Sequence, residues 1–323
     1  MSVSDLAVDI SVIIPCHNAA PYIRQAVASV LDQADLPAGF ELEIVIADDR
    51  SDDGATPAVL AELARRHPQV RVVANVGARG PGPARNCAVR HAGGRWLAFL
   101  DADDWWLPGF LSRGLALIAA NPEAQWVVGR YHIVYDPGTQ QPGRVVDIAF
   151  AEDAAILARA QPVPAGLRWV RPVGIPVNEL ALHTASTWVR RDVFLSQGGF
   201  DERLRNAEDT HLWLRLSAVT DLYHVPDMLS VYRRRAGSET NSGRPQNDWD
   251  VRAHADLYGD PRFRPVRRQF AARIANGCAE DAWRYRRNGH FGDAARTAWQ
   301  GLRYAPGDGR LWRSLLAGAA RRR

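Results

Sequence analysis

Short apolar segments alternate with segments of helical periodicity along the first hundred residues. Apolar runs of strand length cover residues 10–14, 42–47, 70–74 and 95–100. Segments with apolar side chains at helical spacing cover residues 21–33, 56–66 and 84–91, and the Gly- and Pro-rich residues 75–83 predict a loop. Strands that alternate with helices in this way predict an α/β domain, with a mostly parallel sheet covered by helices on both faces.

The pattern beyond residue 120 is less regular. We expect strands at residues 126–135, 144–150 and 184–190, a short helix at 152–160, and loops at 162–176 and 236–248. Further helices are predicted to start near Asp192 and Glu208, and the chain after residue 248 is predicted to be helical to its end. These patterns indicate a main domain over residues 1–240 and a basic helical C-terminal region over residues 241–323.

The charged residues are unevenly distributed along the chain, which contains no lysine, so all 40 basic residues are arginine. Residues 262–323 hold 15 arginines and 4 acidic residues, whereas residues 1–261 hold 25 arginines and 32 acidic residues. A nucleic-acid-binding protein would carry its basic face on the folded domain, so we expect no nucleic-acid partner. The basic C-terminal region indicates contact with an anionic membrane surface, and a solvated helix face is the alternative explanation.

The remaining composition excludes several classes of protein. No run of 18 apolar residues occurs, so no membrane-spanning helix is expected, and the N-terminus lacks the pattern of a signal peptide. The three cysteines (Cys16, Cys87 and Cys278) are far apart and show no metal-ligand spacing. They are typical of a reducing compartment. We therefore expect a cytoplasmic protein, with peripheral contact at the inner face of the membrane as an option.

Acidic residues follow two of the predicted strands directly. Asp48 and Asp49 come after residues 42–47, and the acidic cluster Asp101 to Asp104 comes after residues 95–100. Ligands of open α/β sheets bind beyond the carboxyl ends of the strands, where these carboxylates are placed. Two carboxylates one residue apart, as in Asp101 and Asp103, can share a divalent cation and a sugar ligand. The dinucleotide fingerprint and the Walker A sequence are both absent.

Five segments in order give the chain a specific resemblance. They read ISVIIPCHNAAPYIRQAVASVLDQ, IVIADDRSDDG, GPGPARNCAVRHAGGRWLAFLDADDWWLPGFL, VRRDVFLSQGGFDERL and EDTHLWLRL. This series closely resembles the family 2 glycosyltransferases over residues 10–235. The resemblance implies a GT-A (Rossmann-like) fold and an inverting transfer from a nucleotide diphosphate sugar. It also implies a Mn²⁺ or Mg²⁺ cofactor and a hydroxyl acceptor on a glycan or a lipid-linked sugar in cell-surface glycan biosynthesis.

The resemblance also implies roles for single residues. Asp209 matches the catalytic base, and Asp103 matches the ligand of the metal ion. Substrate-binding positions are implied for Pro15, Asn18, Asp48, Asp49, Arg85, Asp101 and Glu208. The transmembrane helices and the QxxRW signature of processive synthases are missing, so transfer of a single sugar is expected.

Two alternatives stay open at this stage. A nucleotidyltransferase would need basic residues after its first strand, where this chain has CHNAAP. A catalytically silent scaffold that binds sugar nucleotides would not need Asp103 and Asp209 together.

Overall fold

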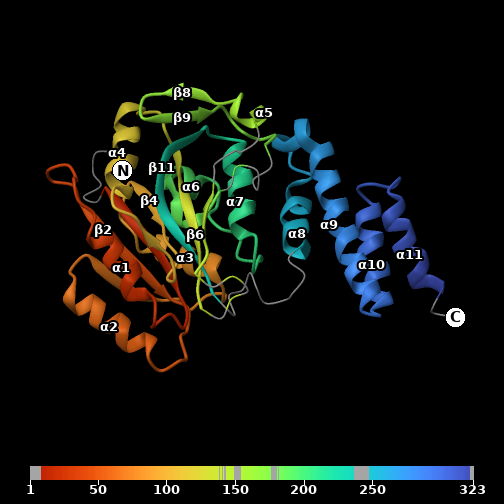
Figure 1. Ribbon diagram of the computed structural model, residues 1–323, viewed down its shortest axis with the longest axis horizontal. Coiled ribbons are helices and arrows are strands. Elements are labelled where there is room, and N and C mark those ends of the chain that lie inside the picture. Colours follow the sequence, from red (N-terminus) through yellow and green to blue (C-terminus); the bar gives the residue numbers. More distant parts are fainter. Residues whose placement is uncertain are drawn as a thin grey trace. The chain divides into compact units, whose positions relative to one another are not determined.

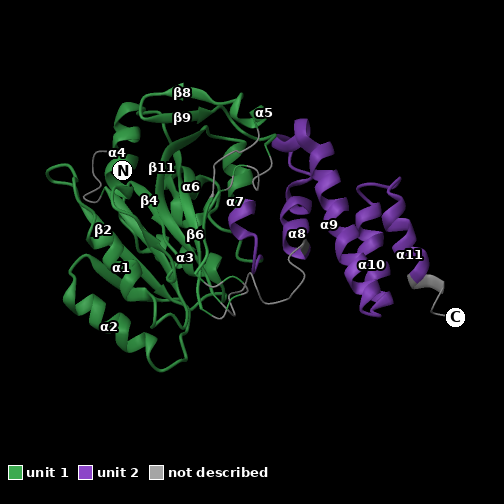
Figure 2. Ribbon diagram, viewed as in Figure 1, with its two compact units in different colours: residues 1–203, 212–238 green, residues 204–211, 239–323 purple. Residues whose placement is uncertain are grey.

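The computed structural model describes residues 9–320 except 138, 140, 142, 149–153, 176–179, 181 and 236–246. The predicted loop at 236–248 lies almost wholly outside the described residues. The chain divides into two compact units, which are coloured separately in Figure 2. Unit 1 comprises residues 1–203 and 212–238, and unit 2 comprises residues 204–211 and 239–323. Among the described residues, no helix is both long and apolar enough to cross a bilayer.

Unit 1 is built around one large sheet (Figure 1). Its main path runs β3-β2-β1-β4-β10-β6-β11-β9-β8, and β5 and β7 pair with β11 and β6. The strands are β1 (Ile10–Cys16), β2 (Leu42–Asp48), β3 (Val70–Ala74), β4 (Trp96–Phe99), β5 (Trp105–Trp106), β6 (Trp126–Tyr135), β7 (Val145–Ile148), β8 (Gln161–Val163), β9 (Gly166–Trp169), β10 (Thr187–Arg190) and β11 (Leu222–Arg234). Because β1, β2, β3 and β4 are parallel neighbours, the residues that follow them meet at one edge of the sheet.

The helices of unit 1 cover both faces of this sheet. They are α1 (Ile23–Leu31), α2 (Thr56–Arg66), α3 (Pro81–Arg90), α4 (Phe110–Ala120), α5 (Ala154–Leu157), α6 (Arg191–Ser196) and the last residues of α7 (Glu208–Ser217). Side chains of successive strand residues point to opposite faces. Val12 and Ile14 therefore pack with α1, α2 and α4, whereas Ile13 packs with α3, α6 and α7. The predicted α/β sheet with helices on both faces is thus confirmed. The sheet is mixed, however: β1 to β4 and the pair of β6 and β11 are parallel, whereas β10, β5, β7, β8 and β9 pair antiparallel with their neighbours.

Several local predictions need correction. Residues 162–176, expected to be a loop, contain β9 and most of β8, which form an antiparallel hairpin around Ala165 at φ 62°. The predicted strand at 184–190 begins with a 3₁₀ turn (Thr184–Ser186), so only β10 is extended. Helix α3 begins at Pro81 inside the predicted loop 75–83, because proline is readily accommodated in the first helical turn.

Unit 2 is helical, as the sequence predicted for the end of the chain. It contains α8 (Asn247–Leu257), a 3₁₀ turn (Pro261–Val266), α9 (Arg267–Arg287), α10 (Phe291–Leu302) and α11 (Gly309–Ala320). Small and apolar side chains form its core, including Ala275, Cys278, Ala282, Ala298 and Leu311. Figure 1 shows α9, α10 and α11 in blue, each beside the next in the chain.

Candidate functional site

The loop after β1 is fastened to the loop after β2 by Asn18. Its amide Nδ2 donates to Asp52 Oδ1 at 2.7 Å, and its Oδ1 accepts from the backbone N–H of Asp52 at 2.9 Å. The backbone N–H of Asn18 donates to Ser51 Oγ, which in turn donates to Asp48 Oδ1 at 2.6 Å. Asn18 has φ 50°, a left-handed conformation that asparagine tolerates better than most residues. Asn18 therefore ties these two loops together, with Asp48 bonded through Ser51, and Pro15 is the last but one residue of β1.

Asp49 is a buried carboxylate that organises the third loop of this edge. Its Oδ1 accepts from Asn75 Nδ2 at 2.7 Å, and its Oδ2 accepts from the backbone N–H of Gly80 at 2.8 Å. Gly80 immediately precedes α3 at φ 128°, a value that L-residues rarely adopt. Asp49 thus ties the end of β2 to the start of the helix that carries Arg85.

Arg85 and Asp101 form an ion pair between α3 and the end of β4. Arg85 Nη2 donates to Asp101 Oδ1 at 2.5 Å, and the guanidinium lies 5.2 Å from the centre of the Phe200 ring. The Arg85 side chain is buried, whereas that of Asp101 is partly exposed. Arg85 can therefore hold Asp101 in one orientation towards a ligand.

Asp103 is contacted by two arginines of β11 and its extension. Arg235 Nε donates to Asp103 Oδ2 at 2.6 Å, and Arg233 Nε donates to the backbone oxygen of Asp103 at 2.8 Å. Arg233 also bonds Asp136 Oδ1 at 3.0 Å and Gln25 Oε1 at 2.6 Å. Its guanidinium further lies 4.7 Å from the centre of the Trp105 ring. Arg233 therefore fixes the turn formed by Asp101 to Asp104, which we call the acidic turn, against the rest of the sheet.

Asp104 is the buried member of the acidic turn. Its Oδ1 accepts from the backbone N–H of Arg233 at 2.9 Å, while its Oδ2 has no hydrogen-bond donor within the described part of the chain. His183 Nε2 lies 3.7 Å from that oxygen. Burial, with Asp103 and Asp101 adding repulsion, raises the pKa of Asp104 well above its usual value.

His183 lies in an aromatic environment beside this turn. Its ring centre is 4.8 Å from that of Tyr131 and 4.6 Å from that of Tyr232. Burial lowers the pKa of His183 to about 4, so the imidazole is neutral at neutral pH. A neutral imidazole adds no repulsion to a cation bound at the acidic turn.

The donor atoms of this turn suit a hard divalent cation. Asp101 and Asp103 offer partly exposed carboxylates, the ligand type that Mg²⁺ and Mn²⁺ prefer. Negative charge is also concentrated there, since burial and the carboxylates of Asp48, Asp53 and Asp103 raise the pKa of Cys16 to about 12. Asp103 is therefore suited to hold a metal ion, and Asp101 is placed to contact a ligand beside it.

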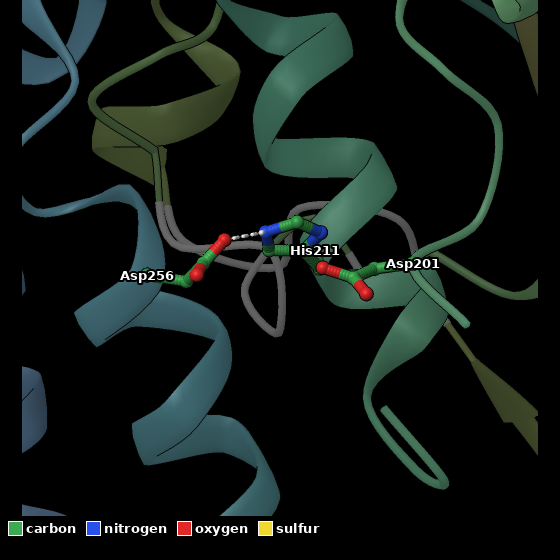
Figure 3. A group of neighbouring side chains, drawn as sticks. All are labelled: Asp201, His211 and Asp256. Atoms are coloured by element: carbon green, nitrogen blue, oxygen red, sulfur yellow. Dashed lines mark hydrogen bonds and ion pairs between the residues drawn. The ribbon is translucent and has the colours of Figure 1, made fainter. Parts of the chain in front are cut away.

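Glu208 and Asp209 begin α7 and belong to unit 2. Glu208 is buried, and Asp209 Oδ1 accepts from the backbone N–H of Thr210 at 2.6 Å. One turn further, His211 Nε2 lies 3.2 Å from Asp256 Oδ2 of α8 (Figure 3). The acidic pair is thus held at the first turn of a helix, where the helix dipole favours negative charge.

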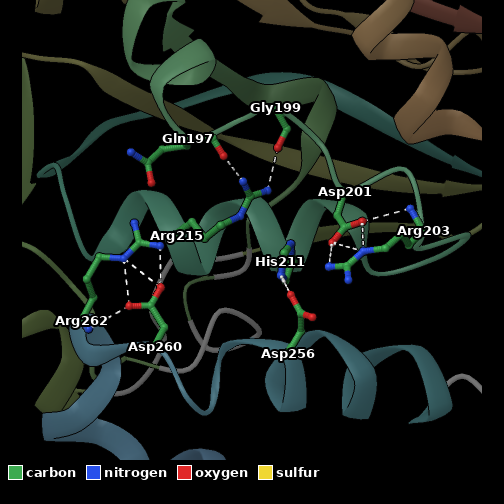
Figure 4. Close-up of polar contacts among 9 residues, drawn as sticks. All are labelled: Gln197, Gly199, Asp201, Arg203, His211, Arg215, Asp256, Asp260 and Arg262. Carbon is green, nitrogen blue, oxygen red and sulfur yellow. Dashed lines mark hydrogen bonds and ion pairs between the residues drawn. The ribbon is translucent and has the colours of Figure 1, made fainter.

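The last turns of α7 are anchored in unit 1 through Arg215. Its guanidinium donates to the backbone oxygens of Gln197 and Gly199, the latter at 2.6 Å (Figure 4). The same view shows the Asp201–Arg203 pair of unit 1 and the Asp260–Arg262 pair of unit 2. Arg215, four residues after His211, therefore fixes the part of α7 that belongs to unit 1.

The site residues predicted from the sequence include Asp101 and Asp103 but not four residues that the structure places at the same turn: Asp104, His183, Arg233 and Arg235. Asp104 stands in the same acidic run, and its place directly before two tryptophans was a signal of burial. Arg233 and Arg235 follow an apolar strand pattern, which gave a weaker signal. His183 carried no signal, because it comes close to Asp104 only through the fold.

The sequence model of the glycosyl transferase family 2 matches residues 11–168. The succinoglycan biosynthesis protein ExoO of Rhizobium meliloti is 40% identical over 109 residues, 34% of this chain and 29% of ExoO. The β-1,3-glucosyltransferase WfgD of Escherichia coli is 32% identical over 125 residues, 39% of this chain and 46% of WfgD. The chain thus spans less than half the length of these two curated relatives. The uncharacterized protein MT1568 of Mycobacterium tuberculosis is 30% identical over 249 residues, 72% of this chain and 69% of MT1568.

Solved structures resemble the chain over most of its length. Residues 1–349 of TarS from S. aureus, in complex with UDP-GlcNAc, align with a TM-score of 0.63 at 17% identity, covering 92% of this chain and 81% of that one. The mannosyltransferase PcManGT from Pyrobaculum calidifontis, in complex with GDP-Man and Mn²⁺, aligns with a TM-score of 0.58 at 22% identity, covering 98% and 82%. The chain therefore belongs to the family 2 glycosyltransferases, and its sheet with flanking helices is a GT-A fold.

Proposed function

We propose that this protein is an inverting glycosyltransferase that moves one sugar from a nucleotide diphosphate sugar to a hydroxyl acceptor. The observation that carries the proposal is the acidic turn at the end of β4, where Asp101 and Asp103 lie beside Arg85 and Arg235. Carboxylates and guanidinium groups in one place suit a diphosphate bound together with a divalent cation. PcManGT, which shares the fold, was solved with GDP-Man and Mn²⁺.

The proposed donor site uses residues of unit 1. The side chains of Asp48 and Asp49 are assigned to the nucleotide, together with Pro15 and Asn18 at the end of β1. Asp101, oriented by Arg85, is assigned to the ribose or the sugar. Asp103 would hold Mn²⁺ or Mg²⁺, and the cation would neutralise charge that develops on the leaving diphosphate, a contribution of several kcal/mol to the transition state.

The proposed transfer is a single in-line displacement. The acceptor oxygen forms a bond to the anomeric carbon while the bond from that carbon to the diphosphate oxygen breaks, so the configuration inverts. Asp209 accepts the proton of the acceptor hydroxyl, and Glu208 binds substrate beside it. One carboxylate base suffices, because the nucleoside diphosphate leaves without being protonated by a side chain.

The acceptor is proposed to be a glycan or a lipid-linked sugar in cell-surface polysaccharide biosynthesis. WfgD is named for transfer of glucose from UDP-Glc to a GlcNAc-diphosphoundecaprenol, and ExoO for succinoglycan biosynthesis. The arginine-rich residues 241–323 would keep the enzyme near such an acceptor through peripheral contact with an anionic membrane at its inner face.

A panel of UDP-, GDP- and TDP-sugars tests the proposal, with Mn²⁺ present and with release of the nucleoside diphosphate as the readout. At least one donor is expected to be consumed when an acceptor is supplied. Removal of the cation with a chelator is expected to abolish turnover, and added Mn²⁺ should restore it. Binding of a donor without turnover under any condition would favour the alternative of a catalytically silent scaffold.

Two variants separate the proposed roles of the acidic residues. Asp209→Asn is expected to keep donor affinity and to lose roughly 10²–10⁴-fold in turnover, the contribution of a well-placed base. Asp103→Asn is expected to weaken Mn²⁺-dependent donor binding. Asp227→Asn, which changes an exposed aspartate of β11, serves as the matched control and should retain activity. Normal turnover by Asp209→Asn would refute the assignment of the base.

A further inference from the structure

An exposed face of α10 and α11 combines aromatic, aliphatic and arginine side chains. Trp299, Trp312 and Leu316 are 60%, 42% and 62% exposed, which is unusual for large apolar residues. The face is defined here by Arg296, Trp299, Arg303, Trp312, Arg313 and Leu316, and we call it the Trp–Arg face.

The helical spacing places these side chains away from the core of unit 2. Arg296 and Trp299 of α10 and Arg303, the residue that caps the helix, follow one another at intervals of three and four residues. The buried residues of α10 are Ala294, Ala298, Gly301 and Leu302. In α11, Trp312 and Leu316 are four residues apart, with Arg313 beside them and Leu311 buried. Each helix thus presents an apolar and cationic stripe opposite its packed side.

The two stripes flank the short connection between α10 and α11. Trp299 lies in the last turn of α10 and Trp312 in the first turn of α11, and the two helices pack against each other within unit 2. The indole Nε1 of Trp312 donates to the backbone oxygen of Pro306 in the connection at 2.7 Å. This bond holds the Trp312 ring beside the connection.

The charge of this region is positive. Within residues 262–323, 15 arginines stand against 4 acidic residues. Two of those acids belong to this part of the chain, Asp293 in α10 and Asp308 directly before α11. Asp293 Oδ1 lies 3.5 Å from Arg296 of the face, and Asp308 Oδ2 lies 2.6 Å from Arg310. The face therefore offers cationic and aromatic groups with little opposing negative charge.

We infer that the Trp–Arg face docks the protein on an anionic phospholipid bilayer. Indole rings settle at the level of lipid headgroups, and arginines near an anionic leaflet gain electrostatic attraction. Exposed leucine beside tryptophan inserts readily at the boundary between headgroups and acyl chains. This inference deepens the membrane contact in the proposed function, and it names the residues and the type of surface that make it.

Vesicle co-sedimentation of the full chain tests the inference. The probes are vesicles of phosphatidylcholine alone and vesicles that contain 30% phosphatidylglycerol, as a chosen assay composition of roughly physiological negative charge. The wild-type protein is expected to bind the anionic vesicles at least about tenfold more tightly than the neutral ones. Removal of charge in Arg296→Gln/Arg303→Gln/Arg313→Gln should lower binding by about fivefold for each arginine.

A second variant tests the apolar part of the face. Trp299→Ser/Leu316→Ser should lower binding to anionic vesicles by about tenfold or more, because apolar insertion is lost. Trp283→Ser, at an exposed tryptophan of α9, is the matched aromatic control and should change binding by less than about twofold. Arg65→Gln/Arg66→Gln/Arg90→Gln, at exposed arginines of unit 1, is the matched charge control.

Three results would overturn the inference. The first is equal binding of the wild-type protein to neutral and anionic vesicles, and the second is an equal loss of vesicle binding in the face variants and in their controls. The third is evidence that the Trp–Arg face mediates self-association. In the last case, sedimentation velocity would show an oligomeric wild-type protein, a monomeric Trp299→Ser/Leu316→Ser variant, and no vesicle binding by either. Asp103→Asn should bind vesicles like the wild-type protein. Vesicle binding without transfer activity would therefore count against the proposed function alone.

Discussion

Asp103 is held by an arginine at the position where a metal ion is proposed to bind. The contact with Arg235 Nε is 2.6 Å long, and both side chains are partly exposed. A cation that binds Asp103 meets the positive charge of Arg235 at the same carboxylate, so the two compete. The bond also gives Asp103 a defined orientation before any ligand arrives, which is what preorganisation requires.

Arg235→Gln is expected to strengthen the binding of Mn²⁺ alone. The removal of a competing, partly exposed ion pair is worth up to roughly 1 kcal/mol, which corresponds to an increase in affinity of up to about fivefold. Isothermal titration with MnCl₂ in the absence of donor measures the change. Arg24→Gln, which removes the exposed ion pair with Glu62 in the same unit, is the control and should leave the affinity unaltered. Unchanged or weaker Mn²⁺ binding by Arg235→Gln would show that Arg235 does not compete.

At the level of elements, β11 connects parts of the chain that are far apart in sequence. It pairs parallel with β6 and antiparallel with β5 and β9. The pairing of β5 with β11 brings Asp103 and Asp104 next to Arg233, 129 residues after Asp104. The acidic turn is therefore shaped by β11, a strand far from it in the sequence.

This pairing explains what the sequence could predict and what it could not. Strands β1, β2 and β4 are largely buried and apolar, and the acidic residues at the ends of β2 and β4 are close to them in sequence, so both were predictable. The hairpin of β8 and β9 was missed because its prolines and glycines dominate a short, partly exposed segment. His183 was missed because nothing in its neighbouring residues reports its distance to Asp104.

The close packing of α4 against β10 depends on a glycine. A Cβ atom at Gly114 would lie 2.2 Å from the Trp188 ring, which is buried in the sheet. Gly114→Ala is therefore expected to destabilise the protein by about 1–3 kcal/mol, more than the roughly 1 kcal/mol gained from helix propensity. Chemical denaturation measures the effect. At Gly307 an added Cβ would meet no atom within 4 Å, so Gly307→Ala should change the free energy of unfolding little. Equal stability of the two variants would contradict the prediction.

The molecule as a whole buries histidines that must be neutral in the folded state. Burial, followed by the positive charge of Arg130, lowers the pKa of His224, in β11, to about 3. Burial also lowers the pKa of His183 to about 4. In the unfolded chain both groups have a pKa near 6.5. At a pH between the folded-state pKa and the unfolded-state pKa, the unfolded state binds more protons than the folded state. The free energy of unfolding therefore falls as the pH is lowered from about 6.5.

This linkage predicts that the protein loses stability in acid, and that replacing one buried histidine makes this loss less steep. Between pH 6.5 and pH 4, each buried histidine contributes a slope of up to about 1.4 kcal/mol per pH unit. His224→Leu removes one such group, so its unfolding free energy should change less steeply with pH than that of the wild-type protein, whatever its value at pH 7. Urea unfolding at a series of pH values measures the slope. His290→Gln replaces an exposed histidine and should keep the wild-type slope, because it leaves both buried histidines in place. A wild-type slope in His224→Leu would mean that protonation of other groups governs the loss of stability in acid.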